Sequence, residues 1–97
     1  MKKIETLQRR QQLIKEDIAA NLDLLIGSVT TKGPKRTGHN LTGKIEGKTR
    51  SRHIPKGLAP RVRQMTKRHN KVRALIRKLS DVNWELLKLQ NQIDQDQ

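Results

Sequence analysis

Cysteine, phenylalanine and tyrosine are absent from this 97-residue sequence, and Trp84 is its one aromatic residue. Without cysteine, the chain cannot form disulfides or thiolate metal sites. The apolar residues are few and are mostly Leu, Ile, Val and Ala, which favours helix packing over a β-sandwich core. A domain of this size is only marginally stable by itself, so we expect support from self-association or from a bound polyanion.

Long apolar runs are also absent. No run approaches the roughly 20 residues that a transmembrane helix needs. The basic N-terminal sequence MKKIETLQRRQQ lacks the continuous apolar core of a signal peptide. We therefore expect no membrane association and a cytoplasmic location, in contact with the nucleoid or with a ribonucleoprotein.

Acidic residues are nearly missing from the middle of the chain, where positive charge accumulates. The formal net charge of the whole chain is +13, but residues 32–78 contain sixteen Lys or Arg and a single acid, Glu46, which gives +15. A surface that is basic only for solubility normally interleaves both signs. An uninterrupted basic block of this kind is typical of proteins that bind nucleic acid.

Two amphipathic helices are predicted. In the first part of the chain, apolar residues recur at spacings of three and four at Ile4, Leu7, Ile14, Ile18, Leu22 and Leu25, with Gln11 as the polar member. This stripe predicts a helix over residues 4–26, ended by Gly27. A heptad-like series predicts a second helix over 60–94, with Pro60 in its first turn: Val62, Met65, His69, Val72, Ile76, Leu79, Leu86 and Ile93. A break near Ser80 is the alternative to a continuous helix.

Residues 28–55 are rich in glycine, β-formers and basic residues. They predict a small basic β-ribbon of two or three strands, with Glu46-Gly47 as a tight turn. Disorder until a ligand binds is the alternative. The predicted fold is therefore mostly α: a long, coiled-coil-like antiparallel helical hairpin with the ribbon between its helices, in a single domain over residues 1–97.

The two predicted helices differ in length. If both begin at the ribbon, the second extends beyond the first by about ten residues. Large apolar side chains left in water there cost roughly 1.5–3 kcal/mol each. This predicts a homo-oligomer, with an interface formed by Val82, Trp84, Leu86, Leu89 and Ile93.

The basic block supplies the candidate nucleic-acid-binding residues. They are Lys32, Lys35, Arg36, Lys44, Lys48, Arg50, Arg52, Lys56, Arg61, Arg63, Lys67, Arg68, Lys71, Arg73, Arg77 and Lys78. We expect the ribbon and the first half of the second helix to form one continuous cationic surface. Arg50 and Arg52 lie two apart, on the same side of a strand. We expect the partner to be RNA or DNA. The combination of a ribbon with a helix, without helix-turn-helix spacing, favours structured RNA over duplex DNA.

Catalytic and metal-binding patterns are not recognisable. His39, His53 and His69 lack the spacing of a metal site, and KGPKRTGHN lacks the spacing of a phosphate-binding P-loop. No serine has the neighbouring base and acid of a nucleophile. We therefore predict a protein that is not an enzyme and that uses neither a metal nor another cofactor.

Several short motifs resemble those of a family of small uncharacterised bacterial proteins that are often encoded near transposases and other mobile elements. The motifs are GSV at 27–29, GH at 38–39, GKT at 47–49 and IPK at 54–56, followed by a long charged helix. The resemblance covers roughly residues 24–87. Family members often carry a cysteine cluster between the first two motifs, where this chain has KGPKR, so no metal role is implied. The resemblance implies a mobile-element context.

Together these patterns predict a non-enzymatic nucleic-acid-binding accessory protein of a mobile element or a ribonucleoprotein. It would bind the phosphate backbone through the basic ribbon and helix. The alternative is a coiled-coil assembly adaptor that docks on a transposase, a reverse transcriptase or another partner protein.

Overall fold

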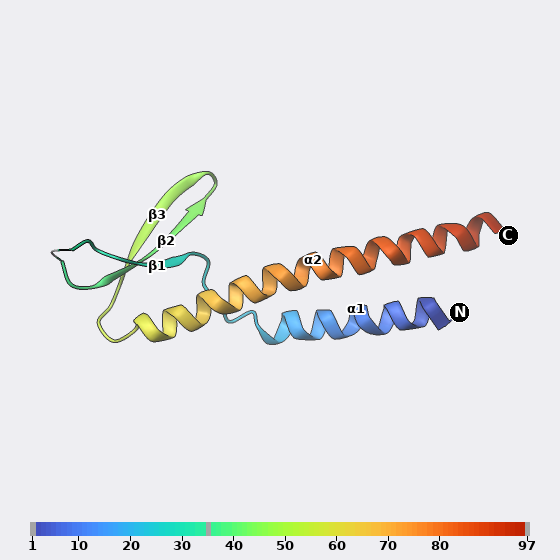
Figure 1. Cartoon of the computed structure of the whole chain (residues 1–97), viewed down its shortest axis with the longest axis horizontal. Coiled ribbons are helices and arrows are strands. Elements are labelled where there is room, and N and C mark those ends of the chain that lie inside the picture. The colour runs from blue at the N-terminus through green and yellow to red at the C-terminus, as the bar shows by residue number, and fades with distance from the viewer. Residues whose placement is uncertain (1, 35, 97) are drawn as a thin grey trace. The chain divides into compact units, whose positions relative to one another are not determined.

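The chain consists of two helices with a small antiparallel sheet between them, in a computed structural model that describes residues 2–34 and 36–96 (Figure 1). The order of elements is α1 (Lys2–Ala20), β1 (Ser28–Thr31), β2 (His39–Ile45), β3 (Lys48–Ile54) and α2 (Ala59–Asp96). The prediction of a mostly helical chain with a central β-ribbon is confirmed. Helix α2 is continuous through Ser80, and Pro60 lies in its first turn. No helix in the described ranges is long and apolar enough to cross a membrane.

The chain divides into two compact units, where the sequence predicted one domain. The helical unit comprises Met1–Leu22 and Lys71–Gln97, and the sheet unit comprises Asp23–Asn70. Helix α2 contributes its first part to the sheet unit and the remainder to the helical unit. Each unit is described by itself below.

The sheet has the strand order β1-β2-β3, and both pairs are antiparallel. Strands β2 and β3 form a hairpin in which Ile45 pairs with Lys48. Between these two residues, Glu46 and Gly47 both have positive φ, 53° and 79°. Two central residues with positive φ are the mark of a type I′ turn, whose twist matches that of the flanking strands. The predicted tight turn is confirmed.

Helix α1 ends at Ala20, six residues before the predicted end at Ile26. The side-chain amide of Asn21 donates to the Asp17 carbonyl oxygen at 2.7 Å, and the chain beyond it leaves the helix. In the sheet unit, Leu25 N then donates to the Met65 carbonyl oxygen of α2 at 3.2 Å. The apolar residues of 24–26 thus pack within the sheet unit instead of continuing the helix, because tertiary contacts outweigh local helix propensity.

Gly27 permits a close approach between this segment and β2. Its φ is +136°, and a Cβ atom built there would lie 2.7 Å from the Thr42 carbonyl oxygen. A side chain at this position would therefore clash with backbone. The glycine that the sequence suggested as a helix stop instead lets the chain pass against the sheet.

The helical unit has its buried residues on α2. Val72, Leu75, Val82 and Leu86 are buried, whereas none of the 19 residues of α1, all of them described, is buried. Ile76 was predicted in the apolar stripe but is 52% exposed, and Leu75 is buried in its place. Spacings of three and of four are both compatible with one helix face, so the neighbouring surface decides which of two adjacent apolar residues turns inward.

Two polar contacts join α1 to α2 within the helical unit. The Gln11 amide donates to Asn83 Oδ1 at 2.7 Å, and Lys71 Nζ lies 3.5 Å from Asp17 Oδ1. An earlier residue of α1 therefore meets a later residue of α2, and Figure 1 shows the two helices side by side. Residues near Asn83 lie beside α1 and do not extend beyond it, so the predicted overhang is wrong. The first part of α2 belongs to the sheet unit.

The burial of Leu75 and the exposure of Ile76 give a direct test of the helical unit. We expect Leu75→Ala to lower the free energy of unfolding by about 2–4 kcal/mol, because it removes buried apolar volume. Ile76→Ala, the matched control, should lower it by less than about 1 kcal/mol. Urea unfolding measures both, and equal effects would contradict the orientation of α2.

Candidate nucleic-acid interface

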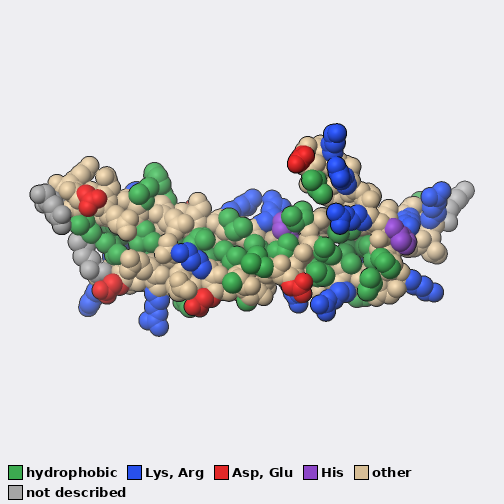
Figure 2. Space-filling model, turned by 180° about the vertical axis from the view of Figure 1, so that it is seen from behind, with side chains coloured by type: hydrophobic (Ala, Val, Ile, Leu, Met, Phe, Trp, Pro, Cys, Tyr) green, Lys and Arg blue, Asp and Glu red, His purple; other side chains and the backbone are tan. Residues whose placement is uncertain are grey.

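Positive charge is concentrated in the sheet unit. Its sequence contains twelve Lys or Arg and only two acids, Asp23 and Glu46, which gives a net charge of +10. The helical unit has ten basic and seven acidic residues, a net charge of +3. Figure 2 shows Lys and Arg side chains protruding over the visible face of the molecule, with fewer acidic side chains among them. The sheet unit is therefore the candidate interface.

The strand register separates the sheet's side chains into two faces. Side chains alternate along each strand, so directly paired residues share a face. The first face, called the apolar face here, contains Val29, Thr31, His39, Leu41, Gly43, Ile45, Lys48, Arg50, Arg52 and Ile54. The opposite face, called the polar face, contains Ser28, Thr30, Asn40, Thr42, Lys44, Thr49, Ser51 and His53.

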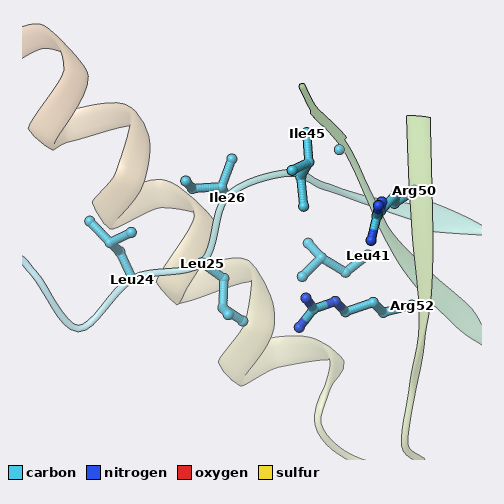
Figure 3. A pocket seen from close by; sticks show the side chains of 8 residues that line it. Leu24, Leu25, Ile26, Leu41, Ile45, Arg50 and Arg52 are labelled. Carbon is cyan, nitrogen blue, oxygen red and sulfur yellow. The ribbon is translucent and has the colours of Figure 1, made fainter. Parts of the chain in front are cut away.

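The apolar face lies towards the segment that precedes β1. Leu24, Leu25 and Ile26 line a cavity of about 260 Å³ together with side chains of the apolar face. Figure 3 shows Leu41 and Ile45 from β2, and Arg50 and Arg52 from β3, around this space. Both arginines are on the same side of the strand, as predicted, but that side is shared with leucine and isoleucine.

The predicted cationic surface of the ribbon is therefore divided between the two faces. Lys48, Arg50 and Arg52 belong to the apolar face, whereas Lys44 belongs to the polar face. All four side chains are exposed. The division follows from the alternation of side chains along a strand. Lys44 shares a face with its partner Thr49, and Thr49 lies one residue from Arg50 and three from Arg52, so both arginines are on the opposite face.

The polar face contains a row of hydroxyl groups that crosses all three strands. Thr30 Oγ1 lies 3.1 Å from Thr42 Oγ1, which lies 3.1 Å from Ser51 Oγ. At one end of the face, Lys32 Nζ contacts His53 Nδ1. The eight positions of this face include no acidic and no large apolar residue. Its chemistry is that of hydrogen-bond donors and acceptors with positive charge at both ends.

Two of the predicted basic residues on α2 are bound to a carboxylate of their own unit. Asp23 Oδ2 lies 3.7 Å from Arg61 Nη2 and 3.3 Å from Arg68 Nη1, and Arg68 Nη1 also donates to the Asp23 carbonyl oxygen. These contacts attach the segment before β1 to α2. Arg61 and Arg68 therefore serve the fold, and a phosphate would have to compete with Asp23 for them.

The other predicted residues differ in their surroundings. In the sheet unit, Lys32 is half-buried, whereas Arg36, Lys56, Arg63 and Lys67 are exposed. In the helical unit, Lys71 pairs with Asp17, and Arg73, Arg77 and Lys78 are exposed. Lys35 lies outside the described residues.

Sequence reasoning missed Asp23 and the hydroxyl row. The sequence does contain a signal for the row, because polar residues occupy every second position of each strand. They are Asn40, Thr42 and Lys44 in one strand and Thr49, Ser51 and His53 in the next. Asp23 lay within a predicted helix, so nothing in the sequence related it to Arg61 and Arg68. Within residues 2–34 and 36–96, no three His, Cys, Asp or Glu side chains come together as a metal site would require.

Comparison of the chain with family models, with curated proteins and with solved structures finds no match. The resemblance to mobile-element-associated proteins therefore stays a prediction. The function proposed below depends on the charges and contacts of the chain itself.

Removing the Asp23 carboxylate should release two arginines for an external anion. We expect Asp23→Asn to cost about 1 kcal/mol of stability or less, because its side chain is 67% exposed. Its affinity for a polyanion should rise more than that of Glu46→Gln, which makes the same change in net charge at the hairpin turn. Thermal unfolding and binding to heparin check this, and an equal gain in both variants would show that net charge alone matters.

Proposed function

We propose that this chain is a non-enzymatic nucleic-acid-binding accessory protein, acting in the context of a mobile element or a ribonucleoprotein. Its sheet unit binds the phosphate backbone of RNA or DNA. Its helices form an antiparallel, coiled-coil-like hairpin that supports assembly with other copies. In the cell it resides in the cytoplasm, with the nucleoid or with a ribonucleoprotein particle.

The observation that carries this proposal is the net charge of +10 on 48 residues of the sheet unit. Asp23 is engaged with α2, and the salt bridges among the described residues leave Lys44, Lys48, Arg50 and Arg52 without a carboxylate partner. Clustered like charges destabilise a compact state through self-repulsion. Phosphates bound along this surface turn the repulsion into attraction and release counterions.

The affinity for nucleic acid should therefore depend strongly on salt. If about seven phosphates are neutralised, the affinity for duplex DNA falls by nearly four orders of magnitude between 50 and 200 mM salt. Fluorescence anisotropy with a labelled oligonucleotide measures the slope of log affinity against log salt. A slope near zero would contradict the proposal.

The same measurement locates the surface. Replacing Lys44, Lys48 and Arg50 near the hairpin turn with Gln should reduce the slope by up to about 0.9 for each phosphate that is no longer neutralised. The matched control replaces Arg9, Arg10 and Lys15, which are exposed on α1, and changes the net charge equally. Equal effects of the two triple variants would mean that binding follows total charge and not the sheet unit.

Apolar side chains exposed in the helical unit favour a second candidate function, that of an assembly adaptor. Trp84 and Leu87 are 60% and 57% exposed, whereas Val82 and Leu86 are buried and Leu89 and Ile93 are half-buried. Figure 2 shows apolar side chains at the surface of the molecule. Of the predicted interface residues, Trp84 is thus the most accessible to another copy or to a partner protein.

A double variant of exposed residues tests assembly without opening the core. Trp84→Glu with Leu87→Glu should dissociate an oligomer, because burying each side chain is worth roughly 1.5–3 kcal/mol. Light scattering measures the mass, and the anisotropy assay measures retained nucleic-acid binding. Loss of the oligomer with binding retained supports the nucleic-acid function. An unchanged oligomer with loss of a co-purified partner enzyme supports the adaptor.

A further inference from the structure

The polar face of the sheet is built differently from the rest of the charged surface. The backbone-binding function proposed above needs only positive charge, yet most side chains on this face are uncharged: two serines, three threonines and an asparagine accompany Lys44 and His53. Carboxylates and large apolar groups do not occur at its eight described positions. Core packing does not account for this choice of residues, and hydroxyl and amide side chains can hydrogen-bond to base edges as well as to phosphate oxygens.

We propose that this face enters the major groove of duplex DNA and contacts base edges there, with Asn40 as a base-reading residue. The proposal rests on the nucleic-acid-binding function of the sheet unit and names its ligand. Base edges in the major groove present hydrogen-bond donors, acceptors and the thymine methyl group. Asparagine can contact adenine with two hydrogen bonds, and Ser and Thr contact several bases.

The major groove, about 12 Å wide, admits a two-stranded β-ribbon. Strands β2 and β3 form such a ribbon, with their backbones about 4.8 Å apart. Short Ser, Thr and Asn side chains let the backbone approach the floor of the groove. The major groove of double-stranded RNA is deep and too narrow for such readout. The geometry of the polar face thus favours duplex DNA as the ligand, whereas the sequence pattern favoured structured RNA.

The hydrogen bonds on the face orient some groups and leave others for DNA. The row from Thr30 through Thr42 to Ser51 holds three hydroxyls in fixed relative positions. Among the described residues, no side chain hydrogen-bonds to the Asn40 amide, which lies half-buried on the middle strand. Its donor and acceptor therefore remain for a base edge.

The opposite face does not fit the same role. Leu41 and Ile45 share it with Arg50 and Arg52, and Leu24, Leu25 and Ile26 lie against it around the cavity in Figure 3. Only the polar face is clear of this segment. The long basic side chain of the polar face is Lys44 near the hairpin turn, where it can reach a phosphate that borders the groove.

Selection from a random duplex library, with the full chain at moderate salt, tests the proposal. The wild-type protein should enrich a sequence and prefer its duplex over the same sequence as duplex RNA or single-stranded DNA. Asn40→Ala should weaken binding to the selected duplex by about ten-fold, with little change for unselected DNA. Lys44→Gln should weaken binding to all duplexes alike.

Adjacent threonines of β1 provide a matched control. Thr30 belongs to the polar face and Thr31 to the apolar face, and both are exposed. Thr30→Val should relax the selected sequence, whereas Thr31→Val should leave it unchanged. Thermal unfolding of each variant separates a defect in recognition from a defect in folding.

The outcomes are distinct. No enriched sequence, an equal or stronger preference for RNA, or equal effects of the two valine variants would overturn the groove proposal while leaving backbone binding intact. Absence of binding to every polyanion, wild type included, would overturn the proposed function itself.

Discussion

The alternation of side chains along β2 and β3 is the constraint on which the sheet unit depends. It places Leu41 on the side of Leu24, Leu25 and Ile26, and it turns Asn40 and Thr42 to the other side. A shift of register by one residue would exchange the two faces, expose leucine and bury hydroxyls. The type I′ turn at Glu46-Gly47 resists such a shift because its two-residue length sets the pairing of Ile45 with Lys48.

Electrostatic repulsion and the contacts around Asp23 act against each other in this unit. Asp23 draws Arg61 and Arg68 towards the segment before β1, which reduces repulsion within the fold. The hairpin receives no such compensation from the described carboxylates near it, since Glu46 forms no salt bridge among the described residues. A ligand that binds the folded state stabilises it by mass action, so a polyanion on the hairpin would support the fold as well as occupy the site.

The helical unit also contains few stabilising contacts. Four apolar side chains of α2 are buried, while the apolar stripe of α1 is only half-covered and a pair of amides, Gln11 and Asn83, joins the helices. Such a unit gains from further apolar contact. Trp84 and Leu87 offer it on the surface of α2, which relates the limited burial within one chain to the proposed assembly.

The sequence by itself determined the two helices, the short β-ribbon between them and the turn at Glu46-Gly47, because these features depend on local periodicity and turn chemistry. It also located the basic block. Only the tertiary structure decided that α1 ends at Ala20, that Leu75 and not Ile76 is buried, and that Asp23 binds two arginines. It likewise decided that Lys44 and Arg50 lie on opposite faces of the sheet. These outcomes depend on contacts between residues far apart in the chain. A local sequence pattern does not specify which distant surface a side chain will contact.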